Sequence, residues 1–224
     1  MNAHPHANGD DTVAIVHNGI IENFVELKEM LAEKYQVKFR SETDSEMIAH
    51  LIGIHMQDGM NLEDAVYQSS KEMRGAYAVA AVSSRDPEKI VAIRKDAPLI
   101  AGIGNGENFI ASDIPALLKY CKEIYLIENG EMVVVTPDAI QIYDENREPV
   151  HREVFHQHLC VSSAHPHKST FPPPSHRPAG HERVPHRHSP TTLCLLLPPD
   201  KDIFPAYAGF WNEILLPKEP HIQT

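Results

Sequence analysis

Hydrophobic and polar positions along the chain follow first a helical and then an alternating period. Residues 12–17 are β-branched and apolar, which predicts a buried strand. Apolar residues at helical spacing then predict a helix over residues 20–35. A second helix is expected after Thr43, because Thr43 and Glu46 have the spacing of a capping box, and a third from about Asn61.

Strands dominate the pattern after the third helix. The expected strands are residues 75–82, 89–94, 99–103, 108–111, 124–127, 132–135, 139–143 and 150–155, with a short helix at 115–120. Asn129-Gly130 predicts a tight hairpin between two of them. Helices followed by a run of strands indicate packed antiparallel sheets with helices on the outside.

The periodicity ends at His156. Of the 18 prolines, 12 lie at or beyond His151, and so do 10 of the 15 histidines. Prolines this dense remove ladder donors and break helices, so we expect one domain at residues 1–156 and a disordered tail at 157–224, with a short apolar segment near residues 204–216. The histidine pairs of the tail lack carboxylate or thiolate partners at ligand spacing, so no metal site is expected.

Charge and cysteine content limit the partners and the cellular compartment that the sequence predicts. The net charge of −11 without a basic stripe argues against nucleic acid as the main partner. The three cysteines fit neither a zinc spacing nor a disulfide framework, so a cytoplasmic protein is expected. No apolar run is long enough to span a bilayer, and no membrane association is expected.

The pair Asn18-Gly19 follows the first predicted strand and can be interpreted in two ways. It can be a connecting turn with no chemistry. It can also hold a negative oxygen, because glycine lets the backbone approach a ligand and the asparagine amide adds a donor. The local residues leave both interpretations open.

Six short motifs, taken together and in order, carry a resemblance. They are NAHPH at residues 2–6, HNGIIEN at 17–23, SETDSE at 41–46, RGAYA at 74–78, PLIAG at 98–102 and FIASD at 109–113. Over about residues 2–156 the chain resembles the glutaminase domain of glutamine–fructose-6-phosphate aminotransferases, which are class II glutamine amidotransferases. The resemblance implies an α+β fold, the N-terminal-nucleophile four-layer αββα sandwich with antiparallel sheets, here incomplete.

The same resemblance implies a substrate and residue roles. The substrate is L-glutamine, whose side-chain amide is attacked by a thiolate, and no cofactor is implied. Asn18 and the backbone N–H of Gly19 correspond to the oxyanion hole, Asp44 to the carboxylate that binds the α-ammonium group, and His4 to a histidine lining the pocket. Asp44 can equally be a helix-start acid that interacts with the helix dipole, and the two roles are compatible.

Departures from the family lead to further expectations. The family's nucleophile is a cysteine at the first position, whereas this chain begins Met1-Asn2, and Cys121 lacks a free α-amine. The stretch with the carboxylate-binding arginine is also missing. We therefore expect a fragment that is inactive alone, with a reading-frame shift near His156 and without the isomerase domain that would bind fructose 6-phosphate. Full-length members are expected to be homo-oligomeric.

Three alternatives stay open beside this interpretation. One is the same domain from another class II enzyme, such as an amidophosphoribosyltransferase. Another is a glutamine-binding regulatory module without catalysis. The third is a nucleotide-binding enzyme, suggested by the glycines in residues 102–106. That run does not match the dinucleotide-binding pattern and precedes a strand, so a loop between strands is expected there.

Overall fold

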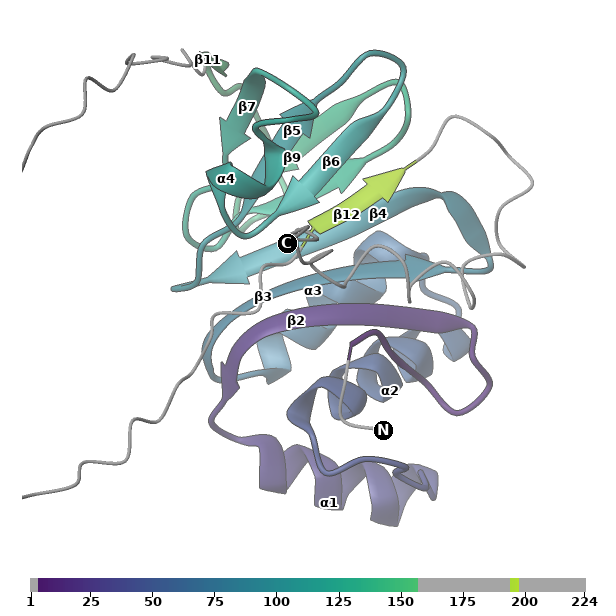
Figure 1. Cartoon of the computed structure of the whole chain (residues 1–224). Coiled ribbons are helices and arrows are strands. Elements are labelled where there is room, and N and C mark those ends of the chain that lie inside the picture. Colours follow the sequence, from purple (N-terminus) through teal and green to yellow (C-terminus); the bar gives the residue numbers. More distant parts are fainter. Residues whose placement is uncertain (1–3, 157–193, 198–224) are drawn as a thin grey trace, which may run out of the picture.

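Two antiparallel sheets lie face to face, and three helices cover the outer face of one of them (Figure 1). The computed structural model describes residues 4–156 and 194–197. The covering helices are α1 (Phe24–Tyr35), α2 (Asp44–Gln57) and α3 (Leu62–Glu72). Among the described residues, none of the helices combines the length and the apolar character needed to cross a lipid bilayer.

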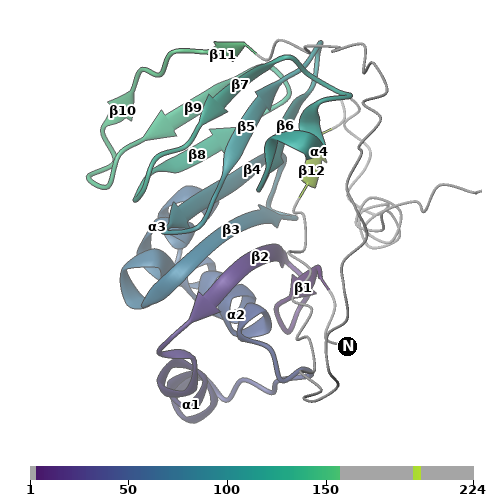
Figure 2. The same ribbon diagram turned by 60° about the vertical axis from the view of Figure 1, so that its left-hand side comes forward.

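The sheets are built mainly from strands that pair with neighbours in sequence (Figure 2). The seven-stranded sheet has the order β1 (His6–Ala7), β2 (Val13–Ile21), β3 (Gly75–Ser83), β4 (Asp86–Lys95), β8 (Met132–Val135), β9 (Ile140–Tyr143) and β10 (Pro149–Val150). The five-stranded sheet has the order β11 (Phe155–His156), β7 (Glu123–Leu126), β5 (Ile100–Ile103), β6 (Asn108–Ala111) and β12 (Cys194–Leu197).

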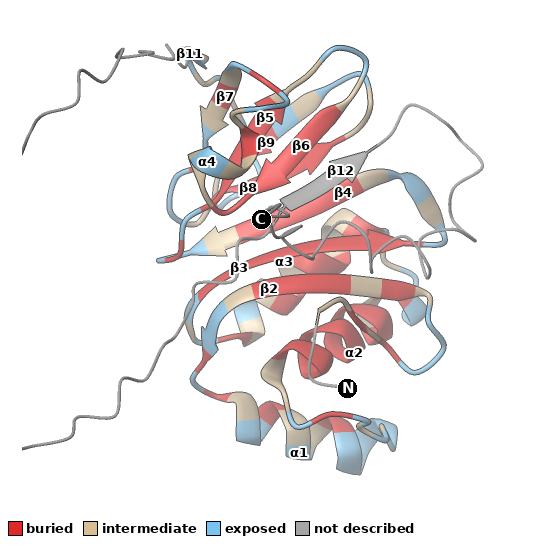
Figure 3. Cartoon of the chain, in the orientation of Figure 1, coloured by how far each residue is buried: buried red, intermediate tan, exposed pale blue. Residues whose placement is uncertain are grey.

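Apolar side chains fill three spaces between the layers (Figure 3). One lies between the helices and the seven-stranded sheet and contains Ile15 and Leu31. Another, between the two sheets, is lined by Val16 and Ile110, and a third lies under the short helix α4 (Ile114–Leu117). The resulting order of layers is helix, sheet, sheet, helix, so the expected α+β sandwich with antiparallel sheets is confirmed.

The starts of α2 and α3 lie where the sequence predicts them. The Thr43 hydroxyl accepts a hydrogen bond from the Glu46 N–H, and the Asn61 side chain accepts one from the Asp64 N–H. The capping box is not reciprocal, however. The Glu46 carboxylate accepts hydrogen bonds from the backbone N–H groups of Arg40 and Ser41 instead, at 2.7 and 2.5 Å. Glu46 therefore fixes the loop that leads into α2.

Two turn predictions from sequence are wrong. Asn18 and Gly19 lie inside β2, which continues to Ile21, and α1 begins at Phe24 rather than at residue 20. Asn129-Gly130 does not form a hairpin, because β7 belongs to the five-stranded sheet and β8 to the seven-stranded one. Turn chemistry shows that the chain bends but does not say which sheet receives the next strand.

The glycine run at residues 102–106 lies where β5 leads into β6, and these strands pair antiparallel. The expectation of a loop between strands is confirmed. Within the segment expected to lack regular structure, Cys194–Leu197 forms β12 and pairs with β6 in register. The rest of residues 157–224, including the apolar segment near 204–216, lies outside the described residues, so the predicted tail stays a prediction.

Candidate functional site

Asn18 and Gly19 lie near the end of β2, where alternation places neighbouring side chains on opposite faces. Ile15 and Ile21 face the helical layer, whereas Val16 packs between the sheets. By this period the side chain of Asn18 lies on the face between the sheets, next to Ala78 of β3, its partner in the ladder. Among residues 4–156 and 194–197 that side chain makes no hydrogen bond, so its amide is available to a ligand.

Position 19 requires glycine because the backbone of β3 approaches β2 closely there. Its φ of +134° lies in the region that favours glycine, and a Cβ added there would lie 2.1 Å from the carbonyl oxygen of Ala76. The residue is exposed, so the missing side chain leaves the backbone of this stretch open to solvent. The pair thus has the donor types and the access that an oxyanion hole needs.

Asp44 is the first residue of α2 and joins that helix to the end of β2. Its Oδ2 accepts a hydrogen bond from the Ile21 N–H at 3.1 Å, and its Oδ1 lies 3.6 Å from Nδ1 of His17. Burial alone would raise the pKa of this carboxyl group, but the hydrogen bonds and the charge interaction with His17 outweigh it and lower the pKa. Asp44 is therefore ionised at neutral pH and a quarter exposed, with 24 % of its side chain accessible.

His4 is linked to Asp44 through Ser45 and His17. Nε2 of His4 is 3.1 Å from the Ser45 hydroxyl, and the same hydroxyl is 3.1 Å from Nδ1 of His17. Burial, together with neighbouring histidines, lowers the pKa of His4 to about 4, so the ring is neutral at pH 7. We call the four residues His4, His17, Asp44 and Ser45 the histidine–serine network.

The four predicted site residues lie in two neighbouring groups. His4 and Asp44 belong to the histidine–serine network, whereas Asn18 and Gly19 lie between His17 and Ile21, the two β2 residues that contact Asp44. No hydrogen bond or ion pair joins Asn18 to Asp44 within the part of the chain that the structure describes. Sequence reasoning missed His17 and Ser45, although each directly follows or precedes a residue it had named.

Cys121 lies away from this site. Its thiol is buried beneath α4 beside Gly102, where a Cβ would approach the sulfur to 2.5 Å, and burial raises its pKa. A buried thiol with a raised pKa is a poor nucleophile. No group of three or more metal-ligating side chains is found among the described residues.

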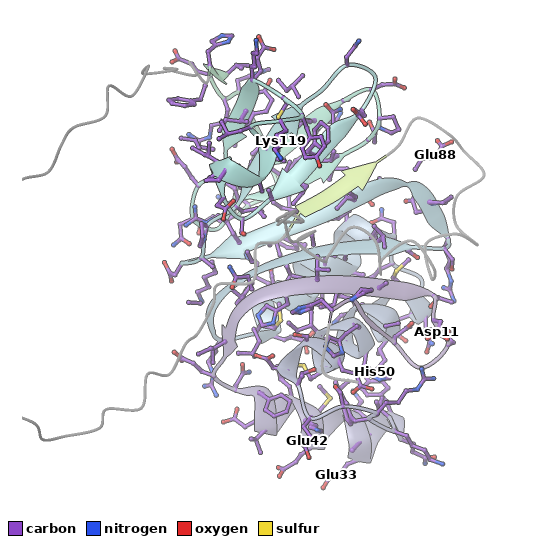
Figure 4. All side chains as sticks on the ribbon, viewed as in Figure 1. Asp11, Glu33, Glu42, His50, Glu88 and Lys119 are labelled. Atoms are coloured by element: carbon purple, nitrogen blue, oxygen red, sulfur yellow. The ribbon has the colours of Figure 1, made fainter. Side chains whose placement is uncertain are left out.

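A cavity of about 590 Å³ opens at the other end of α2. It is lined by residues of α2 and of the loops around it, among them Asn8, Arg40, His50 and Gln57. His50 belongs to α2 and is labelled in Figure 4. Its ring packs edge-on against Phe39. None of the predicted site residues lines this cavity, so it is distinct from the histidine–serine network.

The fold defines the class. Two antiparallel sheets packed face to face, with helices on their outer faces, have the layer order of the N-terminal-nucleophile fold. A match to the family described as "Glutamine amidotransferase domain" covers residues 2–119, more than half of the chain. The chain belongs to this family of glutamine amidotransferases.

Relatives of known activity agree with this assignment. The chain is 49 % identical over 164 residues to the glutamine–fructose-6-phosphate aminotransferase (isomerizing) of Clostridium perfringens, covering 73 % of this chain and 26 % of that protein. It is 48 % identical over 153 residues to the same enzyme of Aquifex aeolicus, covering 68 % and 25 %. The chain thus spans about a quarter of the length of these curated relatives.

Solved structures share the fold at lower identity. The glutamine phosphoribosylpyrophosphate amidotransferase of B. subtilis has a TM-score of 0.53 and 24 % identity, covering 64 % of this chain and 32 % of that one. A structure described as the allosteric regulatory enzyme of purine biosynthesis has a TM-score of 0.54 and 23 % identity, over 64 % and 31 %. At this identity the likeness concerns the fold alone.

Proposed function

We propose that this chain binds L-glutamine, with Asp44 holding the α-ammonium group, His4 lining the pocket, and Asn18 and Gly19 receiving the side-chain carbonyl oxygen. One observation carries the proposal: an ionised carboxylate is held by the two β2 residues that flank the Asn18-Gly19 pair. Glutamine carries a positive group at one end and an amide oxygen at the other. The chain therefore offers a group of the right kind for each end of the molecule.

The reaction that this site supports is the hydrolysis of the glutamine amide. A thiolate attacks the carbonyl carbon, the oxygen becomes an oxyanion stabilised by the Asn18 amide and the Gly19 N–H, and ammonia leaves before water releases glutamate. The ammonia would aminate fructose 6-phosphate to glucosamine 6-phosphate on an isomerase domain, as the curated relatives' name suggests. No cofactor takes part in these steps.

The described residues supply the donors and the carboxylate, but not the nucleophile. Cys121 is buried and remote from the histidine–serine network, so we propose that residues 4–156 do not hydrolyse glutamine by themselves. We also keep as predictions that the protein works in the cytoplasm, that larger relatives are homo-oligomeric, and that neither nucleic acid nor membrane is a partner.

Titration calorimetry of the full chain with L-glutamine tests the proposal, with D-glutamine and L-glutamate as comparison ligands. We expect saturable heat with L-glutamine and weaker binding of both comparison ligands. A parallel assay for released ammonia is expected to stay at background. Absence of heat with L-glutamine would overturn the binding proposal, and ammonia release would overturn the proposed lack of hydrolysis.

Two alternative functions make different predictions. A regulatory glutamine-binding module would bind L-glutamine without turnover and would keep doing so after a separate segment supplying a cysteine nucleophile is added. A domain of an amidophosphoribosyltransferase is disfavoured by sequence, since identity to that enzyme is 24 % against 49 % to the fructose-6-phosphate enzyme.

A further inference from the structure

The Ser45 hydroxyl lies between two imidazole rings that belong to different parts of the chain. Its oxygen is 3.1 Å from Nε2 of His4 and 3.1 Å from Nδ1 of His17, and the residue is 4 % exposed. A hydroxyl has one proton and can therefore donate to only one of the two rings. It has to accept a hydrogen bond from the other.

Asp44 decides the direction of these two hydrogen bonds. Its Oδ1 lies 3.6 Å from the same Nδ1 of His17 that contacts Ser45. An unprotonated Nδ1 would turn its lone pair toward an ionised carboxylate, whereas a protonated Nδ1 is attracted to it. Nδ1 of His17 therefore carries a proton and donates to the Ser45 oxygen, and the Ser45 hydroxyl donates to Nε2 of His4.

The other nitrogen of His17 has no competing partner. Nε2 of His17 is buried and has no hydrogen-bond partner among the described residues, and the side chain is 2 % exposed. The contacts that decide where His17 donates are therefore those of Nδ1, with Ser45 and Asp44.

The direction of these hydrogen bonds also decides which nitrogen of His4 carries the proton. Because Nε2 of His4 accepts from Ser45, it carries no proton, and because burial keeps this ring neutral at pH 7, the one remaining proton is on Nδ1. The ring edge of His4 that does not face Ser45 is then a fixed hydrogen-bond donor. A neutral histidine without such a partner can exchange between its two tautomers.

We propose that Ser45 is a positioning residue of the glutamine site, which, held by His17 and Asp44, fixes His4 as the tautomer with its proton on Nδ1. The proposal rests on the proposed function for its ligand, but the tautomer itself is a property of the free chain. It assigns a role to Ser45 and His17, neither of which contacts glutamine in the proposed binding mode. It also explains why a hydroxyl residue lies directly after Asp44 at the start of α2.

Nitrogen NMR of the imidazole rings tests the tautomer without any ligand. In the free wild-type chain at pH 7 we expect His4 to show a protonated Nδ1 and an unprotonated Nε2, the His4 signal being assigned by its loss in His4→Gln. In Ser45→Ala we expect this preference to disappear, with the Nε2-protonated form becoming populated. Ser45→Thr keeps a hydroxyl on the same carbon and is expected to restore the wild-type signal.

Ser69→Ala is a matched control. Ser69 is also a fully buried serine on a helix, and its hydroxyl donates to the Ala65 carbonyl at 2.7 Å, far along the chain from the network. We expect this variant to leave the His4 signal unchanged. A wild-type His4 protonated on Nε2, or a tautomer that Ser45→Ala does not change, would overturn the proposal.

Glutamine affinity separates this proposal from the function on which it rests. Ser45→Ala is expected to weaken L-glutamine binding about tenfold, the effect of one lost hydrogen bond of good geometry, while Ser45→Thr and Ser69→Ala bind nearly as wild type. Weakening by Ser69→Ala equal to that by Ser45→Ala would overturn the positioning role. No glutamine binding by the wild-type chain would overturn the proposed function, and the tautomer measurement would then decide the inference alone.

Discussion

The backbone N–H of Ile21 donates a hydrogen bond of 3.1 Å to the carboxylate of Asp44. This contact joins the end of β2 to the first residue of α2, two elements that are separated by the whole of α1. The carboxylate accordingly does two things at once: it accepts a hydrogen bond from the backbone of β2 close to the Asn18-Gly19 pair, and it keeps an oxygen 3.6 Å from Nδ1 of His17. A substitution that removes the charge of Asp44 is therefore a direct test of the site.

Replacing Asp44 by Asn removes the charge while keeping the size of the side chain. We expect Asp44→Asn to weaken L-glutamine binding by roughly 2 kcal/mol or more, because a charged hydrogen-bonded pair with the α-ammonium group is lost. Calorimetry measures this change. Asp58→Asn, at the exposed far end of the same helix, is the control and is expected to bind as wild type.

Gly19 and Gly59 form a natural pair for a stability test. Both have positive φ, +134° and +98°, but a Cβ at Gly19 would collide with the β3 backbone, whereas nothing lies within 4 Å of one at Gly59. We expect Gly59→Ala to cost about 1 kcal/mol through backbone strain, and Gly19→Ala clearly more. Urea denaturation of both variants gives the difference, and equal losses would argue against the close approach of β2 and β3.

His4 makes stability depend on pH in a defined window. Its pKa is about 4 in the folded chain and 6.5 in the unfolded one, so the unfolded state takes up the proton first as the pH falls. The stability contributed by neutral His4 is present above pH 6.5 and is lost between pH 6.5 and 4, with a slope of at most about 1.4 kcal/mol per pH unit.

His4→Gln is therefore expected to flatten the dependence of unfolding free energy on pH in this window. Only part of the slope disappears, because burial also lowers the pKa of His6 and of His50, which act with the same sign. Thermal or urea unfolding at several pH values measures the slope. A variant with the wild-type slope would show that His4 is not buried as described.

Glu46 is the acid on which the loop before α2 depends. Its carboxylate accepts from two backbone N–H groups, and those hydrogen bonds outweigh burial and lower its pKa. We expect Glu46→Gln to destabilise the chain by about 1–3 kcal/mol at pH 7, since an amide accepts these bonds less well. The loss should shrink as the pH falls and Glu46 itself becomes protonated.

Glu42→Gln is the matched control for this measurement. Glu42 precedes α2 in the same loop but is exposed (Figure 4), and surface changes of this kind usually alter stability by less than about 0.5 kcal/mol. Equal destabilisation by the two variants would indicate a general effect of loop charge rather than the hydrogen bonds of Glu46.

The starts of α2 and α3 and their caps were predictable because the signals are local. The hydroxyl of Thr43 and the amide of Asn61 act within one turn of chain, and their roles follow from spacing alone. Sheet partners were not predictable in the same way. Asn129-Gly130 has the residues of a hairpin turn, but whether the following strand pairs with β7 or crosses to β4 depends on contacts distant in sequence.

The candidate site was likewise predictable only in part. Resemblance indicated Asn18, Gly19, Asp44 and His4 one by one, but no sequence pattern states that a single hydroxyl lies 3.1 Å from two rings contributed by distant segments. Ser45 reads as an ordinary helix-start serine. Its role follows only when β2, α2 and the segment before β1 are placed in space.

The pairing of β12 with β6 has a consequence for the order of folding. β3 and β4 are close in sequence, so we expect them to pair early, because little loop entropy opposes them. β6 and β12 pair over a long separation in sequence, so we expect β12 to join its sheet after β5 and β6 have paired. Until it does, one edge of the five-stranded sheet has free backbone groups, and a nascent chain is open to pairing with a neighbour at that edge.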